Sequence, residues 1–171
     1  MRRPAPDGRR HAAVLSYGHE YHARLATPFA VLGIRTSGAR LSEIVYLPTG
    51  AATLSPQNRL AETTCQQIER YLDDPQFRFE LPFEFDGSAF RRRVWQAICE
   101  IPPGRPLTYG DVARQIGSAP RAVGGACGAN RIPLVIPCHR VVASGGIGGF
   151  MHARAGAPIQ IKQWLLRHEH V

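Results

Sequence analysis

The 171-residue sequence has no apolar run near the roughly 18 residues that a membrane-spanning helix needs. No hydrophobic segment follows its basic amino terminus, so we expect no signal peptide. The four cysteines form no Cys-x-x-Cys pair and are too few and too scattered for a disulfide scaffold or a zinc site. We therefore expect a cytoplasmic protein with reduced thiols, no membrane association, no metal and no cofactor.

Lysine is almost absent, since Lys162 is the one lysine among 21 basic residues. The net charge is +8, and it is unevenly distributed. Residues 1–90 hold 10 Lys/Arg and 10 Asp/Glu, whereas residues 91–171 hold 11 and 3. Arginine suits bidentate contacts with phosphate. A nucleic acid is therefore the predicted partner of the second half, while an apolar content of 44% excludes a disordered chain.

The sequence predicts an α+β fold in three parts: a flexible leader over residues 1–20, a small sheet-plus-helix domain with its linker over 21–87, and a mainly helical domain over 88–171. In the first domain, Phe29–Thr36 and Leu41–Leu47 are typical of a hairpin. Ser55, followed by a proline, is the expected N-cap of a helix. Alternating aromatic residues in 76–87 indicate an extended linker on an apolar surface.

Helix-capping residues indicate where the helices of residues 88–171 begin. Ser88 precedes an amphipathic segment, and Thr108 with Asp111 forms a variant capping box. The short segment after Thr108 and the next helix form a helix-turn-helix, as in winged-helix domains. The expected elements are helices beginning after Ser88 and at Thr108, a second helix-turn-helix element over Arg121–Asn130, a strand over Leu134–Ile136 and a final helix over Ile159–Glu169.

Cys138 is the candidate reactive residue. Cys65, Cys99 and Cys127 lie in expected helices, where a packed thiol is the ordinary role. A thiol needs a base or a positive charge to become a nucleophile at neutral pH, and His139 and Arg140 follow directly. In an extended segment, however, adjacent side chains point to opposite faces, so the dipeptide alone is weak evidence.

The whole run Pro137-Cys138-His139-Arg140-Val141 resembles the active-site signature of the O6-alkylguanine-DNA alkyltransferases, also called methylated-DNA–protein-cysteine methyltransferases. The resemblance extends in the same order over residues 88–169. The further matches are Val94-Trp95, Ile101-Pro102-x-Gly104, Thr108-Tyr109-Gly110, Ile116-Gly117, Arg121-Ala122-Val123-Gly124, Asn130, Gly149-Phe150 and Lys162-x-x-Leu165-Leu166.

The resemblance implies a repair protein that binds duplex DNA, flips an O6-alkylguanine out of the helix and transfers the alkyl group once, irreversibly, to its own cysteine. It implies that Cys138 is the nucleophile, with His139 and Glu169 as its water-linked relay. Tyr109 would donate a proton to the departing guanine and contact phosphate. The other implied roles are a structural hinge at Asn130, DNA contacts at Arg121, Ala122 and Gly125, and an alkyl pocket at Val141, Gly149 and Phe150.

The sequence departs from the family pattern around the pocket. Phe150 replaces the usual tyrosine, the stretch from Phe150 to Lys162 is about five residues longer, and the turn between Gly117 and Arg121 is about two residues shorter. The sequence leaves open the range of alkyl groups, activity on O4-alkylthymine, and cooperative binding by an expected monomer.

Two alternative hypotheses are a DNA-binding regulator with a structural thiol and a Cys-His hydrolase. The glycine-rich second helix of the helix-turn-helix argues against a regulator, because it offers few side chains long enough to contact base edges. The positive charge of residues 91–171 argues against a hydrolase, which would give no reason for it.

Overall fold

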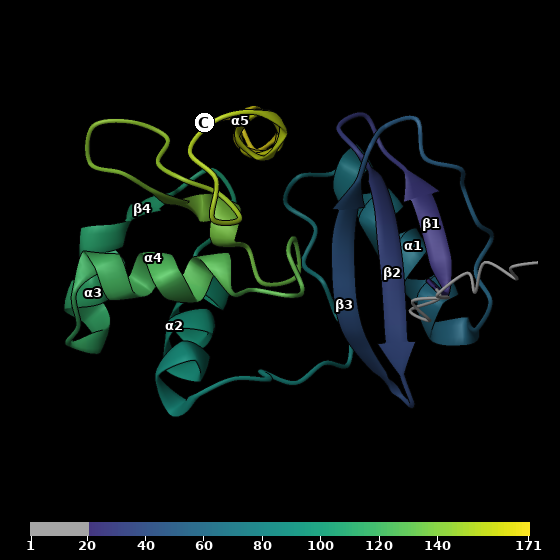
Figure 1. The fold of residues 1–171 in the computed structure, drawn as a ribbon, viewed down its shortest axis with the longest axis horizontal. Helices are drawn as coiled ribbons and strands as arrows, with labels where there is room; N and C mark the ends of the chain where they lie inside the picture. The colour runs from purple at the N-terminus through teal and green to yellow at the C-terminus, as the bar shows by residue number, and fades with distance from the viewer. Residues whose placement is uncertain (1–20) are drawn as a thin grey trace, which may run out of the picture.

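The chain is seen in a computed structural model that describes residues 21–171, so the expected leader over 1–20 lies outside the described part. Figure 1 shows a three-stranded sheet with one helix beside a mainly helical half. This arrangement confirms the predicted α+β class. The expected boundary after residue 87 and the winged-helix comparison stay predictions.

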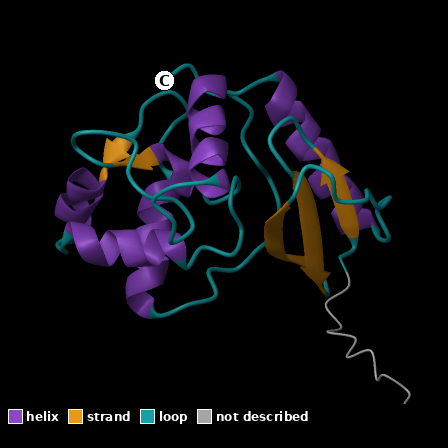
Figure 2. Cartoon of the chain, turned by 45° about the horizontal axis from the view of Figure 1, so that its top comes forward, coloured by secondary structure: helices purple, strands orange, loops and turns teal. Residues whose placement is uncertain are grey.

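The N-terminal half is an antiparallel sheet in the order β1-β2-β3, covered on one face by a helix (Figures 1 and 2). Its β2–β3 hairpin confirms the predicted one, with Ile34 opposite Ile44 in the register. Helix α1 presents Ile68 and Tyr71 to the core, each no more than 1% exposed. The elements are β1 (Ala23–Ala26), β2 (Val31–Ser37), β3 (Arg40–Leu47) and α1 (Arg59–Asp73).

The segment from 76 to 87 carries the chain from α1 to the helical half without regular secondary structure, as the sequence predicts. Its phenylalanines are half-buried and alternate with exposed residues. The Pro82 carbonyl accepts a hydrogen bond from the Leu41 amide at 2.8 Å. The linker is therefore fixed to the edge of β3 and to the apolar surface beneath it.

The C-terminal half contains the expected helix-turn-helix. Ser88 caps α2 (Ala89–Cys99), and Thr108 with Asp111 forms a capping box on α3 (Tyr109–Ile116). Gly117, with φ 65°, ends α3 in the left-handed conformation that glycine adopts without strain. The remaining elements are β4 (Leu107–Thr108), α4 (Pro120–Gly128), a 3-10 turn η1 (Cys138–Arg140), β5 (Val141–Val142), which pairs in parallel with β4, and α5 (Ala157–His168).

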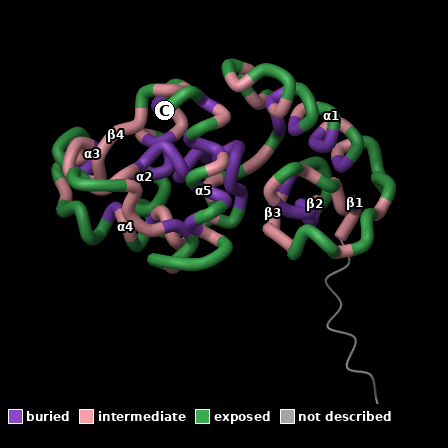
Figure 3. The backbone as a smooth tube through the Cα atoms, turned by 90° about the horizontal axis from the view of Figure 1, so that it is seen from above, coloured by how far each residue is buried: buried purple, intermediate pink, exposed green. Residues whose placement is uncertain are grey.

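Helix α5 lies between the two halves (Figures 1 and 3). Its Trp164 ring packs on Phe29, with 4.7 Å between centroids, and its His168 Nε2 lies 2.8 Å from the carbonyl oxygen of Tyr71. Buried residues of the two halves form one continuous hydrophobic cluster. The C-terminal helix therefore couples the sheet half to the half that carries the candidate thiol.

Four local predictions were wrong in detail. Asn58, not Ser55, caps α1, because its Oδ1 accepts the Ala61 amide at 2.8 Å. The apolar run after Pro133 is not a strand, since Leu134 has φ 72° and the chain turns there. The expected helix over Arg121–Asn130 begins at Pro120 and ends at Gly128, and the one over Ile159–Glu169 begins at Ala157 and ends at His168.

Replacing Asn58 by alanine should lower the free energy of unfolding by about 1 kcal/mol, because the N-cap bond is lost. The variant also loses the hydrogen bond that Asn58 Nδ2 donates to Thr36 Oγ1 at 2.9 Å. Urea unfolding measures the effect, and Ser55→Ala is the matched control with an expected change near zero. A larger loss in Ser55→Ala than in Asn58→Ala would restore Ser55 as the cap.

Candidate functional site

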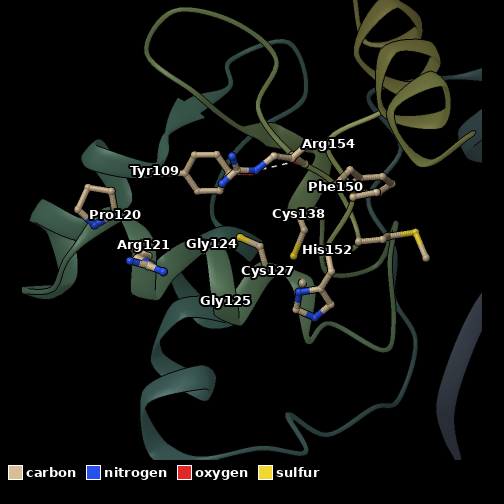
Figure 4. Close-up of a pocket in the computed structure, with 14 residues that line it drawn as sticks. Tyr109, Pro120, Arg121, Gly124, Gly125, Cys127, Cys138, Phe150, His152 and Arg154 are labelled. Atoms are coloured by element: carbon tan, nitrogen blue, oxygen red, sulfur yellow. Dashed lines mark hydrogen bonds between the residues drawn. The ribbon is translucent and has the colours of Figure 1, made fainter. Parts of the chain in front are cut away.

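Cys138 lies at the first position of η1 and is 5% exposed. Its sulfur faces a pocket of about 720 Å³ between helix α4 and the loop after β5. Figure 4 shows Cys138 beside Cys127, with Tyr109 and Arg121 on one side in this view and Phe150 and His152 on the other. A small planar ligand that entered this pocket would meet the thiol.

The backbone around Cys138 is turned rather than extended. The Cys138 amide donates to the Ile136 carbonyl at 2.8 Å, and the Arg140 amide donates to the Pro137 carbonyl at 2.9 Å. The argument that adjacent side chains point to opposite faces of a strand therefore does not apply here. The turn lets Cys138 face the pocket while His139 and Arg140 remain buried behind it.

Asn130 holds the thiol segment from the end of α4. Its Nδ2 donates to the Ile136 carbonyl at 2.8 Å and to Cys138 Sγ at 3.1 Å, and its Oδ1 accepts the Ile132 amide at 2.9 Å. Burial raises the pKa of Cys138 well above its usual value, the neighbouring Cys127 raises it further, and the bond from Asn130 lowers it. The sulfur is therefore a thiol at neutral pH and needs a base to become a nucleophile.

Glu169 is the centre of a buried polar network behind the thiol. Its side chain is fully buried. Its Oε1 lies 2.8 Å from His139 Nε2, accepts the Tyr71 hydroxyl at 2.7 Å and accepts Arg140 Nη2 at 2.9 Å. Arg140 Nε donates to Oε2 at 3.0 Å, and its Nη1 donates to the Ile101 carbonyl at 2.7 Å. The carboxylate is thus paired and hydrogen-bonded on both oxygens.

These contacts decide where the protons are. Burial raises the pKa of Glu169, but the bonds from His139 and Arg140 outweigh it and lower the pKa to about 2. The ionised carboxylate can only accept, so His139 Nε2 carries the ring proton. Burial lowers the pKa of His139, although Glu169 opposes the shift. Its Nδ1 is buried without a hydrogen-bond partner among the described residues, so this nitrogen is free to accept a proton.

Tyr109 and Lys162 both bind the loop that lines the pocket. The Tyr109 hydroxyl donates to the Gly149 carbonyl at 3.1 Å, and Lys162 Nζ donates to the same carbonyl at 2.8 Å and to that of Val141 at 2.6 Å. Burial raises the pKa of Tyr109 to about 12 and lowers that of the fully buried Lys162 to about 8. Tyr109 therefore remains a proton donor at neutral pH.

The exposed side of α4 carries small residues. Arg121, Ala122 and Gly125 are exposed, and the first and last of these line the pocket. Gly128 lies against the His152 ring, where a Cβ atom would come within 2.3 Å of that ring. A helix surface without bulk next to an arginine suits close approach to another backbone.

Cys138, Tyr109 and Gly149 line the pocket, while His139 and Glu169 are buried behind the thiol and Asn130 binds its sulfur. Val141, predicted as a pocket residue, is fully buried and is not part of the lining. Phe150 is buried against Tyr46, with 6.0 Å between ring centroids, and lines the pocket. Sequence patterns did not point to Tyr71, and they made Arg140 only a candidate, beside His139, for activating the thiol; in the structure this arginine pairs with Glu169. Lys162 entered the site only through the family match, because lysine is ordinarily exposed and nothing in its sequence neighbourhood predicts that it is fully buried.

Within residues 21–171, no group of three or more His, Cys, Asp or Glu side chains could hold a metal ion. Over the same residues, every helix is too short or too polar to span a bilayer.

Comparisons with known proteins agree on one family. The model of the 6-O-methylguanine DNA methyltransferase DNA-binding domain matches residues 89–171. A methylated-DNA–protein-cysteine methyltransferase of Methanocaldococcus jannaschii is 32% identical over 133 residues, 76% of this chain and 77% of that protein. One of Salmonella typhimurium is 51% identical over 85 residues, 48% of this chain and 47% of that protein. The chain thus spans about half the length of this second relative.

Solved structures agree with the sequence matches. The crystal structure of Mycobacterium tuberculosis O6-methylguanine methyltransferase has a TM-score of 0.73 and 30% identity, and the match covers 86% of this chain and 92% of that one. A further structure of the mycobacterial protein is in complex with DNA. The chain therefore belongs to the family of methylated-DNA–protein-cysteine methyltransferases.

Proposed function

We propose that this protein repairs DNA by transferring the alkyl group of O6-alkylguanine in duplex DNA to its own Cys138, once and irreversibly. The observation that carries the proposal is the Cys138 thiol in a pocket beside the recognition helix, backed by the buried His139–Glu169 pair. A saturated carbon calls for a soft, strong nucleophile, which a thiolate is. We propose that the residues lining the pocket, Gly149 and Phe150 among them, set the range of alkyl groups that the thiol accepts.

Proton transfer precedes or accompanies attack. The Cys138 proton passes through a bridging water to His139 Nδ1, which has no hydrogen-bond partner among the described residues, and Glu169 stabilises the imidazolium that forms. The sulfur then forms a bond to the alkyl carbon as the bond from that carbon to O6 breaks, and the electron pair moves onto the guanine. Because the thioether product has no easy route back to a thiol, each molecule reacts once.

Tyr109 and Arg121 would act on the DNA side of the pocket. The raised pKa of Tyr109 keeps its hydroxyl protonated at neutral pH, so a proton is present beside the guanine as the electron pair arrives. Arg121 lies on the first turn of α4 at the pocket's edge, where it can fill the space that a flipped base leaves. Ala122 and Gly125 allow the duplex to approach the helix closely.

The charge distribution supports a DNA partner. The half that holds the helix-turn-helix carries the whole net charge of +8. Phosphate contacts of this kind release counterions, so affinity should fall steeply as salt rises. All four cysteines are free in the structure, which suits the cytoplasmic location that we propose together with the repair role. We propose that it acts as a monomer on DNA.

Incubation with an O6-methylguanine duplex should add one methyl group per protein molecule, on the peptide that contains Cys138. Cys138→Ser should show no transfer, because the hydroxyl is a far weaker nucleophile than the thiolate. Cys65→Ser, which changes a buried thiol in α1, is the matched control and should react like the unaltered protein. Mass spectrometry of the digested protein measures the result. Repeated turnover, or methylation elsewhere, would refute the proposal.

Arg121→Ala should slow transfer from duplex DNA by about tenfold, because the unstacking cost of flipping a base is no longer compensated. Transfer from the free base O6-methylguanine should be unchanged, since no flipping is required. Quenched-flow kinetics on the two substrates separate the effects. Arg78→Ala, an exposed arginine in the linker, is the control. An equal loss on both substrates would instead assign Arg121 to the pocket chemistry.

Glu169→Gln tests the charge at the centre of the network. The folded-state pKa of Glu169 is about 2, below the usual 4.5, so the ionised carboxylate stabilises the fold above pH 4.5 and this stabilisation is lost as pH falls toward 2. The stability difference between the unaltered protein and Glu169→Gln should therefore narrow by about 3 kcal/mol over that range. Denaturant unfolding at a series of pH values measures it. A difference that stays constant with pH would contradict a depressed pKa.

A further inference from the structure

One hydrogen bond to Glu169 comes from the N-terminal half of the chain, which carries no net charge. Tyr71 lies on α1, is 1% exposed, and donates its hydroxyl to Glu169 Oε1 at 2.7 Å. The same oxygen lies 2.8 Å from His139 Nε2. On the basis of the proposed function, we propose that Tyr71 is a positioning residue for alkyl transfer, whose hydroxyl holds the Glu169 carboxylate in the orientation that His139 requires.

The Tyr71 side chain is fixed on several sides. Its ring packs against Phe79 and His168, with centroid separations of 5.5 and 5.1 Å. Its own carbonyl oxygen lies 2.8 Å from His168 Nε2, which ties this turn of α1 to the end of α5. Burial and the adjacent Glu169 carboxylate raise the pKa of Tyr71, so the phenol stays protonated and acts as a donor. The Tyr71 hydroxyl is therefore held toward Glu169 and acts there as a hydrogen-bond donor.

The position of this donor matters for the proton on His139. Tyr71 and Arg140 together spread the negative charge of Glu169 over several hydrogen bonds. That reduces the pull of the carboxylate on His139, whose pKa must stay low enough for Nδ1 to be proton-free at neutral pH. Lys162 also faces His139, and both Arg140 and Lys162 lower its pKa. Beside Tyr71, the titratable neighbours are His168, Glu169, Arg140 and Tyr46.

Removal of the hydroxyl has a definite direction. Without it, Glu169 attracts a proton on His139 more strongly, so the pKa of His139 rises. A larger share of the rings is then protonated at neutral pH and cannot accept the proton of Cys138. The acid limb of the rate profile should move to higher pH, and part of the lost rate should return in alkaline solution. A residue that only filled space would change stability without moving this limb.

Tyr71→Phe keeps the ring and removes only the hydroxyl. We expect single-turnover methyl transfer at neutral pH to slow roughly tenfold, with unchanged affinity for the duplex, and the acid limb to shift up by about one pH unit. Tyr21→Phe is the matched control. Its ring lies against Arg35 in the sheet half rather than against the thiol or the Glu169 network, so its profile should match that of the unaltered protein.

Two measurements separate this inference from the proposed function. An NMR titration of the His139 ring needs no substrate, and it should show the upward shift in Tyr71→Phe whether or not methyl transfer occurs. A double-mutant cycle with Glu169→Gln then tests the route: if Tyr71 acts through Glu169, removing its hydroxyl in that background has little further effect on the rate.

The outcomes are distinct. Failure of the unaltered protein to methylate Cys138 refutes the proposed function and leaves the titration result standing. An unshifted His139 titration in a folded Tyr71→Phe protein, or additive losses in the cycle, overturns the role of Tyr71. If Tyr71→Phe did not fold, an NMR observation on the unaltered protein would still test the role of Tyr71. A slowly exchanging Tyr71 hydroxyl proton with a nuclear Overhauser contact to the His139 ring is expected, and its absence would count against the proposal.

Discussion

The buried carboxylate of Glu169 is the interaction on which the rest of the site depends. Burying an ionised group costs several kcal/mol unless charged partners and hydrogen bonds compensate for it. Here three side chains do so: His139, Arg140 and Tyr71. The same contacts that make the charge tolerable also set the tautomer of His139. Structural stability and the readiness of the thiol's base therefore have a common origin.

That dependence explains why the two halves pack as one unit. Arg140 reaches Glu169 from the thiol turn, Tyr71 reaches it from the sheet half, and α5 delivers it at its C-terminal end. Loss of any one partner would leave a buried charge partly uncompensated, so the cost would be felt in both halves. The N-terminal half has no net charge to attract DNA, but through Tyr71 it stabilises the buried carboxylate of the reactive half.

Local signals in the sequence predicted much of the fold. The capping residues Ser88 and Thr108 begin helices where expected, and the phenylalanines of the linker are half-buried while the residues on either side of each are exposed. Predictions failed where competing local signals were similar. Ser55 and Asn58 are both good caps, and only the docking of Asn58 on Thr36 distinguishes them. Leu134–Ile136 has the composition of a strand, but the chain turns at Leu134 so that Asn130 can bind Ile136 and Cys138.

The sequence by itself determined the helix-turn-helix, the uneven charge and the candidate thiol, because capping, periodicity and composition are properties of neighbouring residues. The family motif also pointed to His139 and Glu169. Only the tertiary structure decided that Arg140 pairs with Glu169 rather than with the thiol, and that Tyr71, 98 positions from Glu169, shares its carboxylate. Contacts between residues so far apart leave no local pattern, since they arise only when the core brings the separate elements together.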